Sequence, residues 1–329
     1  MREPLFIKKN KDRWEQLSAT KMADPDDLSN NYLQVMDDLS YAQTFYPNSK
    51  THHFLNERAV GFYNEIYSKR KTSMVRSFID FWAVELPLAI KENHRQLLYA
   101  TAFFLSFMLI GIVSAAYESG FLGEIIGQDY VEMTKDNIQR GDPFGVYKDP
   151  NYLGMFIRIA LNNILLTILL VYATGIFAGI GTLYSLMTNG IMLGSFQYLF
   201  FEYGLGWQSI LVIWIHGVFE ISAIVIAGGA GLAMGNSLLF PGTLSRMNSL
   251  KKGAARSAKI LVITIVMLLI AAWLESYVTH LSSNFFDNEA KGQAELPAWG
   301  SSLILISCTA FICWYFMWLP IKVAKRQIK

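Results

Sequence analysis

The chain has 329 residues, of which 53% are hydrophobic, 14% aromatic and only 16% charged, whereas an average soluble domain carries roughly 25% charged residues. Its mean hydropathy is +0.29 and its formal net charge is only +2. These values exclude disordered, collagen-like and nucleic-acid-binding proteins and disfavour an ordinary soluble enzyme. The two cysteines, Cys308 and Cys313, lie in one apolar run, a spacing that predicts neither a disulfide framework nor a metal clip.

Residues 1–76 have the composition of a soluble domain. The first 96 residues hold 14 of the 28 Lys and Arg and 13 of the 26 Asp and Glu, and no apolar run long enough to span a membrane begins before Leu97. The helix-breaking pairs Asp24-Pro25 and Pro47-Asn48 divide this region into three predicted helices. Their expected bounds are Lys8–Met22, Leu28–Phe45 and Thr51–Lys71. We expect Asp37 and Asp38 to be exposed helix charges.

Residues 77–96 follow as a separate segment. Within Ser77–Ile90, an apolar stripe with helical spacing is formed by Phe78, Ile79, Trp82, Leu86 and Ile90. An aromatic amphipathic helix directly before a membrane span is typical of a segment lying along the membrane surface, so Phe78 and Trp82 are predicted membrane-interface residues. The alternative is a helix of the soluble domain's own core.

Residues 97–321 have the composition of a transmembrane domain. The clear apolar spans are Leu97–Tyr117, Ile159–Tyr184, Ile260–Val278 and Ser301–Leu319. Gly190–Leu239 is ambiguous, because it is apolar but contains Glu202, His216, Glu220 and several glycines. The fold class that follows is an all-α, polytopic membrane protein with an N-terminal helical domain.

Loop charges orient the spans, because positively charged loops stay in the cytoplasm. Loop 118–156 holds three basic and seven acidic residues, whereas 241–259 holds five basic residues and no acid. Loops 118–156 and 281–300 are therefore predicted to be external, and both termini, including the basic tail 322–329, to be cytoplasmic.

Because both termini are predicted on the same side of the membrane, the number of membrane crossings must be even. Because Gly190–Tyr203 is shorter than the roughly 17 residues that a span needs, we expect Gly190–Leu239 to form a pair of short or broken helices. The chain then has either six crossings or four crossings and a re-entrant pair.

His216 and Glu220 are the most informative ionisable residues of the membrane domain. They are four residues apart and share one helix face, and ionisable groups at this depth are costly unless paired. We expect a direct His216–Glu220 hydrogen bond inside the bundle. The alternatives are a proton or substrate path, or a metal or catalytic site needing a third group from Glu202, Glu275 or His280. No cofactor or metal is predicted.

Other polar and small residues have simpler interpretations. Asn162, Asn163 and Asn189 are expected to form amide hydrogen bonds between helices. Glycines at near-helical spacing favour close helix packing; those predicted to do so are Gly179, Gly181, Gly190, Gly194, Gly217, Gly228, Gly231 and Gly235.

The order of these motifs resembles the stage II sporulation protein M family. The blocks are Asn162-Asn163, Gly181-Thr182-Leu183, Asn189-Gly190, Leu193-Gly194, His216-Gly217-Val218-Phe219-Glu220 and Ala227-Gly228 through Gly235. The resemblance implies a polytopic protein of the bacterial inner membrane that acts in a complex recruiting peptidoglycan-degrading partners.

Two functions are therefore expected. The first is a non-enzymatic integral membrane scaffold for cell-envelope assembly or remodelling, with the lipid bilayer, other membrane or envelope proteins and a second copy of the chain as partners, and no nucleic acid. The alternative is a transporter, channel or lipid-handling protein with a path past His216, Glu220 and Glu202. An intramembrane hydrolase is a weaker third reading.

Overall fold

The computed structural model describes residues 1–19, 25–67, 73–118, 120–148, 150–287, 290 and 292–327. These residues are almost entirely helical, and no strand occurs among them. They divide into two compact units, Met1–Phe78 and Ile79–Lys329. Parts of several sequence predictions lie outside the described residues, namely helix ends 20–22 and 68–71, the acidic residues 149 and 289, and the tail end 328–329.

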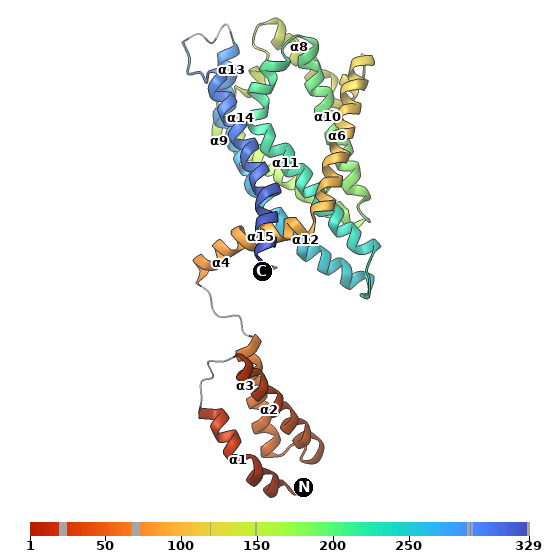
Figure 1. Ribbon diagram of the computed structural model, residues 1–329. Helices are drawn as coiled ribbons and strands as arrows, with labels where there is room; N and C mark the ends of the chain where they lie inside the picture. The colour runs from red at the N-terminus through yellow and green to blue at the C-terminus, as the bar shows by residue number, and fades with distance from the viewer. Residues whose placement is uncertain are drawn as a thin grey trace. The chain divides into compact units, whose positions relative to one another are not determined.

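The N-terminal unit contains three helices with a hydrophobic core of their own (Figure 1). They are α1 (Glu3–Ala19), α2 (Pro25–Phe45) and α3 (Lys50–Tyr67). The buried side chains of this core are Phe6, Trp14, Val35, Leu39, Ala42, Leu55, Ala59 and Phe62. All three helices were expected, because their apolar residues recur at helical spacing.

Asp38 is not the exposed helix charge that the sequence suggested. Its side chain is only 14% exposed, it pairs with Arg13, and it accepts a hydrogen bond from Trp14 Nε1 at 2.9 Å. The carboxylate thus ties α2 to α1. Helical periodicity does not predict this contact, because Arg13 and Asp38 lie on different helices.

The second unit is a bundle of long helical stretches (Figure 1). Five of the helical stretches are long and apolar enough to span a membrane. These are α6 (His94–Tyr117), α9–η3–η4 (Tyr152–Leu166, Thr167–Tyr172 and Ala173–Ile176), α11 (Gly206–Leu239), α12–η5–α13 (Arg246–Leu274, Glu275–Thr279 and His280–Phe286) and α14–η6–α15 (Ala298–Ile312, Cys313–Trp318 and Leu319–Gln327). The all-α, polytopic fold is confirmed.

A further long helix is α10 (Ile180–Glu202), which is continuous over 23 residues. At 1.5 Å per residue it is about 35 Å long, enough to cross the apolar core of a bilayer. Its sequence includes two polar amide side chains, Asn189 and Gln197. Its length favours six crossings over four and a re-entrant pair.

The boundaries predicted around α10 were wrong. The uncharged run Ile159–Tyr184 is not one span, because the chain turns at Ala178 and Gly179, both with positive φ. Gly190–Leu239 is not a pair of short or broken helices either, since α11 continues unbroken for 34 residues. Its glycines fill helix contacts instead of interrupting the helix.

The predicted interfacial segment is divided between exposure and burial. It forms α4 (Met74–Asp80), the π-helical turn η1 (Phe81–Glu85) and α5 (Leu86–Glu92). Phe78 is 66% exposed, whereas Leu86 and Ile90 are fully buried, because α5 packs against α12 and α15. The C-terminal part of the apolar stripe is therefore buried against the helices of the bundle. Placement of Phe78 and Trp82 at a membrane surface stays a prediction.

The two ends of the bundle differ in their connections. The first, here called the loop end, carries α7 (Phe121–Ile126), α8 (Gln128–Gln139), the 3₁₀ turn η2 (Gly145–Tyr147) and α13. Lys148 joins its two connections by pairing with Asp142 at 2.8 Å and with Asp287. The opposite end, here called the basic end, carries residues 241–259 and α15.

Candidate functional site

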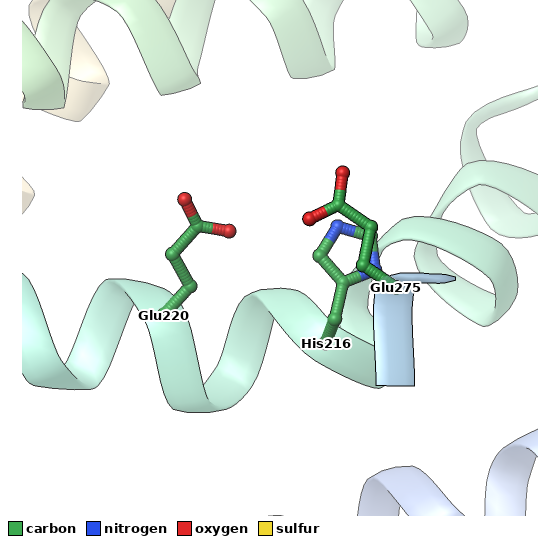
Figure 2. Close-up of side chains that lie close together, drawn as sticks. All are labelled: His216, Glu220 and Glu275. Atoms are coloured by element: carbon green, nitrogen blue, oxygen red, sulfur yellow. The ribbon is translucent and has the colours of Figure 1, made fainter. Parts of the chain in front are cut away.

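A cluster of three ionisable side chains lies inside the bundle near the loop end (Figure 2). His216 and Glu220 come from α11, and Glu275 begins the π-helical turn η5. One ligand-type atom from each lies within 4.8 Å of the other two. Of the three groups that the sequence offered as a third member, the structure selects Glu275.

The local helix geometry explains why these three meet. The i, i+4 spacing places His216 and Glu220 on one face of α11. In η5 the wider π-helical turn brings both Glu275 and Thr279 to that face, an arrangement often found at functional sites. Glu275 was predicted as an intramembrane polar residue, but its proximity to His216 is set by this turn.

The expected direct hydrogen bond between His216 and Glu220 is not formed. His216 is 4% exposed, and its Nδ1 is 3.0 Å from Thr279 Oγ1. Glu220 Oε1 instead accepts from Asn163 Nδ2 at 2.9 Å. Each side chain is therefore held by a group on another helix, and the cluster links α9, α11 and η5.

The loop end covers the cluster. Tyr147 from η2 lies with its ring centroid 5.6 Å from that of His216, and Phe144 stacks on Phe200 at 5.4 Å. Burial raises the pKa of Tyr147 well above its ordinary value, with smaller contributions from Tyr130, Glu275 and Glu220.

The remaining predicted polar residues do not join the cluster. Glu202 is exposed at the end of α10. Asn162 donates to its neighbour Asn163 at 3.4 Å, and Asn189 donates to Ser185 of its own helix. Of the three asparagines, Asn163 alone forms an interhelical hydrogen bond of the predicted kind, to Glu220 of α11.

A cavity of about 320 Å³ lies between α11 and α14, but it is apolar. It is lined by Ile210, Trp214, Val218, Ile221, Ser222, Leu305, Thr309 and Ile312. None of the three cluster residues lines it. A path past His216, Glu220 and Glu202 would need those groups to share one wet space, and in this structure Glu202 is apart from the other two.

The predicted glycines divide into several kinds. A Cβ on Gly194 would lie 2.0 Å from the Met108 carbonyl oxygen, and one on Gly190 would lie 2.8 Å from that of Phe104, so both allow α10 to touch α6. Similar close contacts occur at Gly228, Gly231 and Gly235. Gly111, which sequence reasoning missed, faces the backbone of Ile191.

Three predicted packing glycines have other positions. Gly217 has no neighbour within 4 Å of an added Cβ. Gly179 has a φ of 83° at the turn before α10, where a left-handed conformation favours glycine. An added Cβ on Gly181 would first meet Thr174 across that same turn. Spacing alone did not separate these roles.

Comparison with known families agrees with this architecture. The family model described as "Stage II sporulation protein M" matches residues 100–280, more than half of the chain. The protein therefore belongs to the stage II sporulation protein M family, as its motifs indicated. A second model, "Domain of unknown function (DUF8413)", matches residues 4–68 in the N-terminal unit. No curated protein and no solved structure shows significant similarity to the chain.

Proposed function

We propose that the protein is a non-enzymatic scaffold of a cell-envelope assembly or remodelling complex, held in the bacterial inner membrane and docking a partner through its N-terminal unit. The observation that carries the proposal is the two-unit architecture. A separately folded three-helix unit, matched by its own family model, is attached to a stage II sporulation protein M membrane bundle.

The charge distribution supports a cytoplasmic position for the docking unit. The basic end carries Arg246, Lys251, Lys252, Arg256 and Lys259 without an acid between residues 241 and 259. Positively charged connections are retained in the cytoplasm. Since residues 79–93 run to the same end as this connection (Figure 1), the N-terminal unit is expected on that side as well.

Cysteine labelling tests this orientation. In a Cys308→Ala, Cys313→Ala background, cysteines are placed singly at Lys135 in α8 and at Lys252. A membrane-impermeant maleimide is expected to label intact cells at position 135, and at position 252 only after permeabilisation. Labelling of position 252 in intact cells would overturn the charge argument.

Photocrosslinking tests the docking role. A photoreactive residue replaces Leu33 or Val60, which are 59% and 50% exposed on the N-terminal unit, or Ala42, which is fully buried in its core. We expect a discrete protein adduct in the native membrane from an exposed position and none from position 42. Leu33→Glu and Val60→Glu variants should then assemble into a smaller complex on native gels at unchanged protein level.

The scaffold proposal has a clear contrary outcome. If removing residues 1–72 shrinks the complex on native gels by no more than the mass of the deleted residues, and neither exposed position gives an adduct, the N-terminal unit docks nothing. The alternative transport role has less support, because Glu202 is apart from His216 and Glu220 and the cavity between α11 and α14 is apolar.

A further inference from the structure

The cluster in α11 and η5 has an unusual composition for the interior of a membrane bundle. Its three members, His216, Glu220 and Glu275, each direct a ligand-type atom toward the others, and the three atoms lie within 4.8 Å of one another. Two carboxylates this close repel each other strongly when both are ionised, and burial adds a large desolvation cost. Either a proton on one carboxyl group or a cation bound between the two would relieve both costs.

The hydrogen bond to Thr279 fixes how His216 presents its ring. Thr279 Oγ1 donates to the Leu274 carbonyl oxygen at 3.2 Å, and a hydroxyl has only one hydrogen to donate. We therefore assign its 3.0 Å contact with His216 as Nδ1–H donating to Oγ1. Nε2 is left with a lone pair, and Figure 2 shows that the second ring nitrogen is directed toward the carboxylate of Glu275.

With both glutamates ionised, three acceptors thus converge without a donor among them. Asn163 satisfies one oxygen of Glu220, and the charge of Arg158 attracts Glu275 from outside the cluster. Neither contact supplies a positive group to His216 Nε2. A single cation placed among the three atoms would interact favourably with all of them at once.

We propose that His216, Glu220 and Glu275 bind one divalent transition-metal cation, with Zn²⁺ the best match. A neutral imidazole with carboxylates is a ligand set that Zn²⁺ and its neighbours accept, whereas Mg²⁺ and Ca²⁺ prefer oxygen ligands alone. Two carboxylates and a neutral imidazole carry two negative charges, which a divalent ion balances.

The distances require only small movements. Ligand atoms about 2.1 Å from a tetrahedral zinc lie roughly 3.4 Å apart, so the widest separation of 4.8 Å closes by a little over 1 Å. Rotation of the two glutamate side chains, which are partly exposed, supplies such a movement. Three protein ligands leave the fourth position of the tetrahedron for water or a small ligand.

The groups around the cluster have the roles that second-sphere groups play at metal sites. Thr279 holds the imidazole by the nitrogen that faces away from the cluster, and Asn163 orients the carboxylate of Glu220. Such contacts fix the tautomer and direction of the ligands. A bound ion would join α11 to η5 directly beneath Tyr147, and so would hold the covered loop end in place.

Metal binding to the purified full-length chain tests the proposal. The protein carries a histidine-free affinity tag and the substitutions His52→Gln and His53→Gln, which remove two adjacent histidines of the N-terminal unit. After chelator treatment and reconstitution in nanodiscs, Zn²⁺ is titrated by calorimetry, and bound metal is counted by mass spectrometry. We expect one Zn²⁺ per chain.

Matched variants separate the site from adventitious binding. Glu220→Gln and Glu275→Gln keep side-chain size while removing a charged ligand, and each is expected to weaken zinc binding at least tenfold. Thr279→Val keeps all three ligands but removes the hydroxyl that orients the His216 ring. It is expected to weaken zinc binding on the order of 10–100-fold. Glu202→Gln, outside the cluster, should bind as the parent protein does.

Co²⁺ gives a readout that depends on coordination alone. Bound at this site, it should show visible absorption bands in the parent protein that are lost in His216→Gln. Absence of a one-to-one Zn²⁺ site in the folded parent protein, or equal binding by the Glu275→Gln variant, would overturn the proposal. The scaffold role does not enter these measurements, so either proposal can fail alone.

Discussion

Two helix–helix contacts in the bundle are stabilised in different ways, one by close backbone packing and the other by polar side chains. Where α10 lies against α6, Gly111, Gly190 and Gly194 let the backbones touch, and one side chain, Ser195, donates across the contact at 3.3 Å to the Gly111 carbonyl oxygen. Where α11 lies against α9 and η5, the contact includes ionisable and amide side chains, each held from another helix.

This difference shows what each contact can contribute. Lipid is as apolar as the helices, so the α6–α10 contact depends on close packing and tolerates no added atoms. The polar contact of α11 costs desolvation energy and must recover it through partners. We expect the first to determine whether the bundle forms, and the second to determine how its loop end is held and what it binds.

The largest effect is expected from filling the α6–α10 contact. In Gly194→Leu the new Cβ alone would lie 2.0 Å from the backbone oxygen of Met108, which cannot move aside as a side chain would. We expect a loss at or above the roughly 3 kcal/mol that marks severe overpacking, seen as aggregation during size-exclusion chromatography in detergent. Gly217→Ala, which has open space around it, is the matched control and should behave as the parent protein does.

A smaller effect is expected from leaving one polar partner unsatisfied. Glu220→Leu removes the acceptor of Asn163, and His216→Ala removes the group bonded to Thr279, so each should destabilise the chelator-treated protein by about 1–3 kcal/mol. Glu220→Gln keeps an acceptor oxygen and should cost much less. Thermal unfolding in detergent measures all three, and equal losses for Glu220→Leu and Glu220→Gln would show that the hydrogen bond with Asn163 does not matter.

The sequence predicts these two contacts unequally. The spacing of Gly190 and Gly194, and the shared face of His216 and Glu220, follow from helical periodicity. The approach of Glu275 does not, because it lies 55 residues beyond Glu220 and reaches the cluster through a π-helical turn that the sequence does not announce. Helical periodicity predicts which residues share a face of one helix. A site formed between helices can be predicted only when the packing of those helices against one another is known.

Helix boundaries failed for a related reason. An uncharged run contains no signal that divides it, so the turn at Ala178 and Gly179 was merged into one long span. The shortness of Gly190–Tyr203 leads us to expect broken helices after it, whereas α11 is continuous and Gly228, Gly231 and Gly235 lie in the close contacts predicted for them. Hydropathy locates membrane segments, but close backbone contacts decide where each helix ends.

The ion pair that joins the loop-end connections should have an intermediate effect. Lys148 is 22% exposed and bridges Asp142 and Asp287, the latter only 7% exposed. Lys148→Met leaves Asp287 without this cation, and we expect a loss of about 1–2 kcal/mol, detected as faster hydrogen exchange in residues 144–147. Adding Asp287→Asn should restore part of the protection, whereas an additive loss would show that the two residues do not act as a pair.

The smallest effect is expected at the basic end, where a comparable ion pair is exposed. Lys259 Nζ lies 2.8 Å from Glu85 Oε2 and joins α12 to η1, but the two side chains are 45% and 50% exposed. Water and salt screen such a pair, which typically contributes well under about 1 kcal/mol. Lys259→Met should therefore shift thermal unfolding less than Lys148→Met does, and the small shift should disappear at high ionic strength. The membrane orientation should also be unchanged, because Arg246, Lys251, Lys252 and Arg256 still mark the connection as basic. If Lys259→Met instead destabilised the protein as much as Lys148→Met, burial would not explain the difference in stability between the two ion pairs. The contact of η1 with α12 would then be one that stabilises the bundle.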